Sequence, residues 1–123
     1  MNSNKQSAVD FLEMVIAGDI DAAYEKHIDM TGRHHNVFTP AGMQALQNGM
    51  KEAAARFPHM QSTVQHVLGD GDLVAVHSSL VLEEGKPAMA VVHLFRFENG
   101  KIVELWDVGQ TGSPDSINTD GAF

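Results

Sequence analysis

The sequence predicts an α+β fold in which three N-terminal helices pack on one face of a curved antiparallel sheet. Two observations support this prediction. In the first half of the 123 residues, apolar side chains recur at helical spacing. In the second half, runs rich in β-branched and aromatic residues alternate with short turns that contain glycine. A chain of this length can bury one core, so we expect a single domain over residues 1–123 with a polar tail, 109–123.

Two short helices are expected at the start of the chain. The first carries an apolar stripe with a 3.6-residue period: Ala8, Leu12, Val15 and Ile16. Gly18 is a suitable residue to end this helix. Asp19 can cap the second helix, which is expected to run to about His27. Both helices would present apolar faces to the sheet.

The third helix follows a segment without clear periodicity. Residues 28–42 contain glycine and proline, and we expect a loop there with at most a short strand. Thr39 as the cap and Pro40 in the first turn would begin the helix, and Pro58 would end it. Its apolar stripe consists of Met43, Leu46, Met50, Ala53, Ala54 and Phe57.

Four strands are expected in the second half, over residues 62–68, 73–83, 88–97 and 101–108. The segments between them contain the turn signals Asp-Gly-Asp, Glu-Gly-Lys and Asn-Gly. Turns this short join neighbouring antiparallel strands, so the strands should form a meander.

Composition excludes several classes of function. The formal net charge of −8 argues against nucleic acid or an anionic membrane as a partner, because both attract basic surfaces. The chain has no cysteine and therefore no disulfide, thiolate zinc site or cysteine nucleophile. No apolar run is long enough for a signal peptide or a membrane span. We expect a cytoplasmic protein.

The last hairpin carries two titratable residues, His93 and Asp107, in otherwise apolar strands. A two-residue turn at 99–100 would place His93 opposite Trp106 and Asp107 on the other face. A three-residue turn at 98–100 would pair Phe97 with Lys101 and place His93 opposite Leu105, with Asp107 as its diagonal neighbour. A shift of one residue inverts every side chain, so the turn decides whether the two residues can meet.

The three-residue turn is expected because it leaves one face of the hairpin apolar apart from His93 and Asp107, while the other face mixes charged and apolar side chains. One face then holds Val91, His93, Phe95, Val103, Leu105 and Asp107, and the other holds Val92, Leu94, Arg96, Ile102, Glu104 and Trp106. A carboxylate among apolar groups is desolvated, and a nearby protonated histidine favours its charged form, so the pair suits general acid–base chemistry. The two side chains could equally well only satisfy each other across the sheet.

Three segments of the second half resemble the SnoaL-like polyketide cyclase family of the nuclear transport factor 2 superfamily: Gly71–Ser78, Phe95–Glu104 and Trp106–Val108. The resemblance covers nearly the whole chain, including the His-Asn pair at 35–36 and residues 118–123. It implies a cone-shaped nuclear transport factor 2-like fold, with a pocket at the open end of the curved sheet.

The resemblance also implies a chemistry. Cyclases of this type close a ring by intramolecular aldol condensation without a metal or cofactor, with an acid–base aspartate that matches Asp107 and a histidine that matches His93 beside it. His77 resembles a further family histidine. Adjacent histidines on a strand point to opposite sides, and of His34 and His35 we expect His35 to face the pocket. Asn36 would then donate to a substrate carbonyl.

The sequence therefore predicts a cofactor-independent cyclase or isomerase that acts on a small apolar carbonyl compound, with Asp107 and His93 as catalytic residues and His35, Asn36 and His77 as substrate-binding residues. The alternatives are a binding domain for a small apolar ligand in the same pocket and an interaction domain with a vestigial pocket. A metal site of the three histidines at 35, 77 and 93 lacks a recognisable ligand pattern, so none is expected. Trp106 on the outer face suggests a homodimer, which is common in the superfamily.

Overall fold

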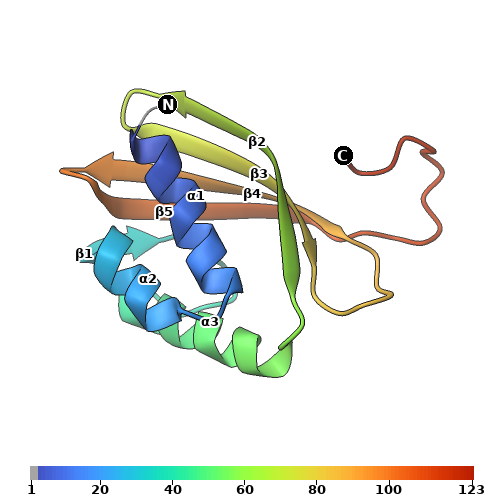
Figure 1. The fold of residues 1–123 in the computed structure, drawn as a ribbon, viewed down its shortest axis with the longest axis horizontal. Coiled ribbons are helices and arrows are strands. Elements are labelled where there is room, and N and C mark those ends of the chain that lie inside the picture. The colour runs from blue at the N-terminus through green and yellow to red at the C-terminus, as the bar shows by residue number, and fades with distance from the viewer. Residues whose placement is uncertain (1–2) are drawn as a thin grey trace.

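The structure, a computed structural model, describes residues 3–123 and confirms the α+β fold (Figure 1). The helices are α1 (Ser3–Ile16), α2 (Ile20–His27) and α3 (Met43–Arg56). The strands are β1 (Ile28–His34), β2 (Gln61–Asp70), β3 (Leu73–Val81), β4 (Met89–Glu98) and β5 (Lys101–Gln110). None of the helices in this part of the chain is long and apolar enough to cross a membrane.

The five strands form one curved sheet in the order β1-β5-β4-β3-β2. The strands β2 to β5 make the expected antiparallel meander. The sheet is nevertheless mixed, because β1 pairs with β5 in parallel. For this segment the sequence predicts a loop with at most a short strand, because its seven residues show no apolar alternation. The edge of β5 provides the partner that makes it a strand.

The β4–β5 hairpin corrects the expected turn. Asn99 and Gly100 both have positive φ, 51° and 78°, as in a two-residue type I′ turn, and Glu98 pairs with Lys101. The three-residue turn is therefore wrong. A β-bulge follows, because Phe97 pairs with Ile102 whereas the preceding residue of β4 pairs with Glu104. Val103 is the extra residue.

The bulge restores the predicted facing of the two titratable residues. Beyond it, His93 lies directly opposite Asp107, rather than opposite Leu105 as expected. The prediction that His93 and Asp107 share a face is confirmed, although through a different register. Ile102, which was expected on the outer face, pairs with the inward Phe97 and is fully buried.

The core fills one end of the inner face. Phe11 of α1 packs edge-on against Phe95 of β4, with ring centroids 5.9 Å apart, and against Tyr24 of α2 at 5.5 Å. Residues from all three helices and from four of the strands complete this cluster: Ala8, Ile20, Ala23, Ile28, Met43, Leu46, Val74, Val76, Phe97, Ile102 and Leu105. The helices thus anchor the sheet where β3, β4 and β5 lie together.

Two helix ends shape the other end of the inner face. Helix α1 ends at Ile16 and is followed by Gly18, whose φ of 90° suits glycine. The N–H of Asp19 donates to the carbonyl of Met14 at 2.9 Å. Asp19 precedes α2 as expected, but its side chain makes no capping hydrogen bond. The turn at residues 17–19 brings α1 to a stop before it covers the sheet completely.

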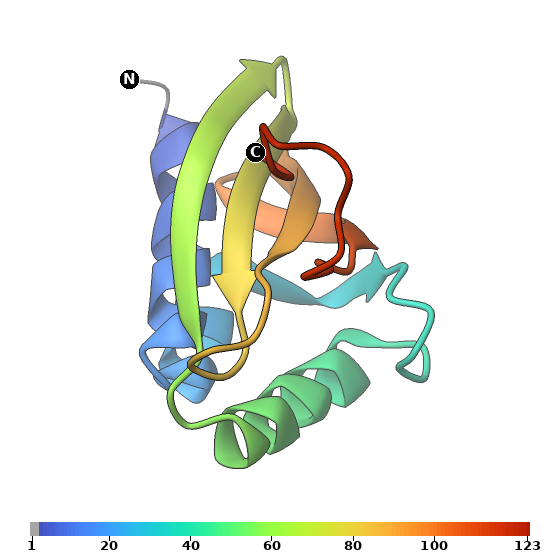
Figure 2. The ribbon, with the colours of Figure 1, turned by 90° about the vertical axis from the view of Figure 1, so that its right-hand side faces the viewer.

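Helix α3 begins at Met43 and not at the expected cap Thr39. The hydroxyl of Thr39 donates to Oδ1 of Asn36 at 3.0 Å, so it is engaged in the preceding loop instead of capping a helix. Gly42, with a φ of 101°, occupies the N-cap position. The helix lies across the end of the sheet, below the inner face in Figures 1 and 2.

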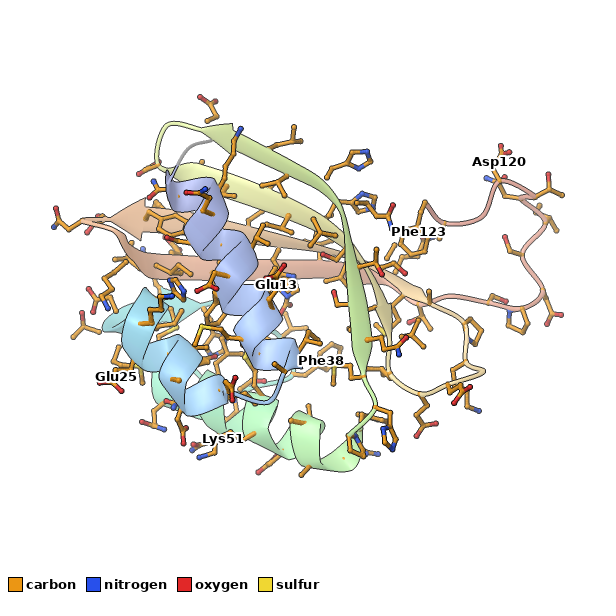
Figure 3. The ribbon with its side chains drawn as sticks, in the orientation of Figure 1. Glu13, Glu25, Phe38, Lys51, Asp120 and Phe123 are labelled. Carbon is orange, nitrogen blue, oxygen red and sulfur yellow. The ribbon has the colours of Figure 1, made fainter. Side chains whose placement is uncertain are left out.

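The C-terminal segment lies on the other side of the sheet from α1 (Figure 2). Strand β5 continues through Gln110, so the irregular segment begins at residue 111 and not at 109. Figure 3 shows this segment looping away from the sheet past Asp120 and returning at Phe123. The ring of Phe123 lies 6.1 Å from that of His77.

Gly32 of β1 lies against the bulge, and this contact can be tested. A Cβ atom at Gly32 would lie 2.3 Å from the carbonyl oxygen of Val103, a backbone atom that cannot rotate away. We expect Gly32→Ala to lower the free energy of unfolding by about 1–3 kcal/mol, measured by urea denaturation. Gly49→Ala in α3 is the matched control, because its Cβ would meet Thr39 at an ordinary 3.7 Å and alanine favours a helix by about 0.5–1 kcal/mol. Equal effects of the two substitutions would contradict the close approach.

Candidate active site

A cavity of about 300 Å³ lies beside the core, between the helices and the inner face of the sheet. Along β4 the inward residues Phe97 and Phe95 are buried in the core, and the next ones, His93 and Val91, line the cavity. The rest of the wall comes from the ends of α1 and α3, the turn that includes Gly18, and strands β2 and β3. The cavity exists because α1 stops short of this end of the sheet.

The wall of the cavity is mostly apolar and carries no ionic side chain. Leucine, valine, alanine, methionine and phenylalanine side chains dominate it, and within the described residues no Asp, Glu, Lys or Arg contributes. The polar side chains in the wall are those of Ser62, Ser78 and His93. Such a lining accepts an uncharged, largely apolar molecule and offers it few hydrogen bonds.

His93 is the titratable group of this wall. Its ring stacks on that of Phe95, with centroids 5.9 Å apart, and its Nδ1 is buried without a hydrogen-bond partner. Burial lowers the pKa of His93 below the ordinary value of 6.5, and the opposite charge of Asp107 offsets part of that shift. His93 is therefore neutral at pH 7 and able to accept a proton.

Asp107 lies opposite His93 on β5 and is only partly buried. Its Oδ2 accepts a hydrogen bond of 2.8 Å from Nδ2 of Asn36. Within residues 3–123, Asp107 and His93 form neither a hydrogen bond nor an ion pair, so they do not simply satisfy each other. Asp107 is not part of the cavity wall either. The negative charge of Asp107 nevertheless raises the pKa of His93, which does line the cavity.

Asn36 positions this carboxylate, a role that differs from the expected donation to a substrate. While Nδ2 donates to Asp107, Oδ1 accepts from the N–H of Phe38 and from the hydroxyl of Thr39, both at 3.0 Å. Both ends of the amide are thus engaged within the protein. Asn36 does not line the cavity, and its contacts tie the loop before α3 to the end of β5.

The two adjacent histidines point to opposite sides, as expected, but His35 does not face the cavity. His34 is the buried one, and its Nε2–H donates to the carbonyl of Pro40 at 2.8 Å. His35 lies on the outer face, where its ring stacks on Trp106 at 5.1 Å and its Nε2 lies 2.6 Å from Oε2 of Glu104. Neither histidine lines the cavity.

Glu104 is the centre of an ionic cluster on the outer face. Besides His35, it contacts the guanidinium groups of Arg33 and Arg96, each at 3.2 Å. These contacts, the hydrogen bond with His35 above all, hold the pKa of Glu104 below its ordinary value. The cluster links strands β1, β5 and β4 on the outer face. Its role is therefore structural, and it does not contribute to the cavity.

His77 also lies on the outer face, which corrects its expected place in the polar set of the pocket. It pairs with Val92 across β4, and its ring is parallel to that of His66, with the two Nδ1 atoms 3.0 Å apart. The histidines at 35, 77 and 93 are therefore not brought together. Among residues 3–123, no group of three or more His, Cys, Asp or Glu side chains is arranged to hold a metal ion.

Ser78 is the wall residue that sequence reasoning missed. It lies on the inner face of β3, is 3% exposed, and its hydroxyl has no hydrogen-bond partner. A signal was present, because Ser78 continues the alternation of Val74 and Val76 as a polar residue in an apolar series. On the inner face of a sheet that packs against helices, such a position is normally apolar.

Comparison with known proteins agrees with this architecture. Residues 8–105 match the model of the SnoaL-like domain family. No curated protein sequence matches the chain.

Three solved structures illustrate the fold. IdmH from Streptomyces antibioticus, assigned as a polyketide cyclase, is 22% identical over 89% of this chain and 93% of its own, with a TM-score of 0.73. AclR from Streptomyces galilaeus, assigned as a hydroxylase, is 20% identical over 87% and 88%, with a TM-score of 0.74. A nuclear transport factor 2-like protein of unknown function from Cytophaga hutchinsonii is 15% identical over 89% and 92%, with a TM-score of 0.72. One fold thus carries different assignments, so function has to be argued from the site.

The desolvated imidazole of His93 predicts a specific pH dependence of stability. Because its pKa is lowered in the folded state, the unfolded chain binds more protons as the pH falls below 6.5. The stability of the folded state is therefore full above pH 6.5 and decreases as the pH falls toward the lowered pKa. We expect His93→Leu to flatten this part of the curve, measured as the free energy of unfolding between pH 5 and 7. Parallel curves for the wild type and His93→Leu would contradict the buried neutral histidine, and the exposed His59→Gln is the control that should leave the curve unchanged.

Proposed function

Since the chain belongs to the SnoaL-like domain family, we propose that it is a cofactor-independent acid–base enzyme of the cyclase or isomerase type that acts on a small apolar carbonyl compound. The observation that carries this proposal is the apolar cavity with one neutral, unpartnered histidine in its wall and a carboxylate opposite that histidine. Structural neighbours that are assigned as polyketide cyclases support the class of reaction.

In the proposed reaction, His93 removes a proton from the carbon next to the carbonyl group of the bound molecule. The electron pair of the broken C–H bond moves to the carbonyl oxygen and gives an enolate, and His93 becomes an imidazolium. Asp107 stabilises this imidazolium by its charge. The imidazolium then returns the proton, either to another carbon in an isomerisation or to the alkoxide that forms when the enolate carbon attacks a second carbonyl in an aldol ring closure.

This assignment exchanges the roles that the family resemblance implies. Asp107 was expected to transfer the proton, with His93 beside it. In this chain His93 borders the cavity, whereas Asp107 lies outside the wall and is held by Asn36. We therefore assign proton transfer to His93 and place Asp107 and Asn36 as positioning residues that act through it.

A non-catalytic binding domain for a small apolar ligand is the alternative. The apolar wall favours it as much as it favours catalysis, because neither the volume nor the lining requires a reaction. The two functions differ in one respect: only the enzyme needs His93 to exchange a proton with the bound ligand.

Proton exchange can be measured without knowledge of the natural substrate. The probe is 2-tetralone, an uncharged bicyclic ketone with acidic hydrogens next to its carbonyl group, dissolved in D₂O at neutral pD with catalytic amounts of protein. We expect the wild type to accelerate the replacement of these hydrogens by deuterium, followed by ¹H NMR. His93→Gln should slow the catalysed exchange by about 10²–10⁴-fold, and Asp107→Asn should slow it less.

His77→Gln is the matched control, because it removes an imidazole from the outer face and should leave the exchange rate unchanged. Binding of 2-tetralone without catalysed exchange would favour the binding domain. Equal rates for His93→Gln and the wild type would contradict the assignment of His93.

We also propose that the protein forms a homodimer through the outer face of the sheet, as first suggested by Trp106. Three exposed apolar residues lie on this face in addition to Trp106: Leu68, Leu73 and Val108 are 67%, 42% and 63% exposed. An apolar patch of this kind is typical of a subunit contact.

Val108→Glu should therefore shift the protein from dimer to monomer in native mass spectrometry at micromolar concentration. Lys86→Gln, outside the strands, is the control, because it also makes the net charge more negative by one. A wild-type protein that is monomeric at high concentration would contradict the proposal.

A further inference from the structure

We infer that Ser78 binds the carbonyl oxygen of the guest and makes the cavity selective for uncharged ketones. This inference deepens the proposed function and rests on the same cavity. It adds a substrate-binding residue, Ser78, that neither the family resemblance nor the comparisons assign.

Ser78 and His93 are neighbours in the wall of the cavity. Val76 pairs with His93 across β3 and β4, and Ser78 pairs with Val91, so Ser78 is the diagonal neighbour of His93 on the inner face. Both residues line the cavity. A guest held against one of them therefore lies within reach of the other.

Both residues carry a buried polar atom without a partner. Among the side chains of residues 4–123, the hydroxyl of Ser78 and Nδ1 of His93 are the only buried polar atoms that make no hydrogen bond within the protein. Folding normally avoids such atoms because their loss of hydration is unfavourable. That both of them occur in the wall of one cavity indicates that a guest completes their hydrogen bonds.

The chemistry of the wall restricts the guest. A carboxylate or an ammonium group would lose its hydration among apolar side chains without an opposite charge in the wall. A hydrocarbon would leave the hydroxyl unpaired. A neutral carbonyl oxygen accepts a hydrogen bond from the hydroxyl, and the serine oxygen can turn toward it by rotation about a single bond.

The same hydrogen bond would assist the proposed reaction. When His93 removes a proton from the guest, negative charge develops on the carbonyl oxygen. A hydrogen bond from Ser78 to that oxygen becomes charge-assisted and therefore stronger than in the ground state. Ser78 would thus hold the ketone and favour the enolate over the ketone.

Binding of two probes of nearly equal shape tests the inference. The probes are 2-tetralone and tetralin, which lacks the oxygen, and their dissociation constants are measured by isothermal titration calorimetry. We expect Ser78→Ala to raise the dissociation constant of 2-tetralone by about three- to tenfold, because one hydrogen bond is lost. The dissociation constant of tetralin should stay the same or fall. The control Ser79→Ala, next to Ser78 on β3 but on the outer face and outside the cavity wall, should change neither constant.

A second measurement needs no ligand. Because the hydroxyl of Ser78 has no partner within the protein, Ser78→Ala should raise the Tm or leave it unchanged, whereas removal of a serine that bonds within the protein would lower it. A lowered Tm, an equal loss of affinity for both probes, an unchanged affinity for 2-tetralone, or a wild type that binds neither probe would overturn the inference.

These outcomes differ from those that test the enzyme. If Ser78→Ala weakens the binding of 2-tetralone but not that of tetralin, and the wild type does not catalyse exchange, Ser78 is a ligand-binding residue and the proposed reaction is wrong. If the wild type catalyses exchange and Ser78→Ala binds 2-tetralone as before, the reaction stands and the role of Ser78 is wrong.

Discussion

The β-bulge at Val103 is the constraint on which the site depends. It adds one residue to β5 between the hairpin turn and the catalytic region, and it thereby turns Asp107 inward, opposite His93. Without the bulge, the two-residue turn would place Trp106 opposite His93 and point Asp107 away from it. Gly32 allows the parallel strand β1 to pass against the bulge, since a side chain there would collide with the backbone. A backbone feature outside the cavity thus sets the chemistry inside it.

The electrostatics of the cavity follow from this arrangement. Burial keeps His93 neutral, and the charge of Asp107 on the facing strand limits how far the pKa of His93 falls. Asn36 holds the carboxylate at one side and the loop before α3 at the other, so the position of the charge is fixed by the fold. The pair can therefore accept a proton from a guest and stabilise the imidazolium that forms, within a wall that contributes no other charge.

Much of the fold was predictable because it follows from local patterns. Apolar periodicity located the three helices and the strands β2 to β5, and the alternation along β4 and β5 placed His93 and Asp107 on one face. The bulge was not predictable, because two turn geometries fit the same residues and the choice depends on packing against β1. Strand β1 itself carries no apolar alternation, so the orientation of His34 and His35 depends on a parallel partner far away in sequence. Ser78 was detectable only as a polar break in an apolar series.

The titration of His93 tests the central claim, that a buried neutral histidine in the cavity wall is supported by the charge of Asp107. NMR signals of the imidazole ring give its pKa in the wild type and in Asp107→Asn, without any substrate. We expect a pKa below 6.5 in the wild type and a still lower one in Asp107→Asn, because the variant loses the charge that favours the protonated form. A His93 that titrates at or above 6.5, or whose pKa is the same in both proteins, would contradict the account.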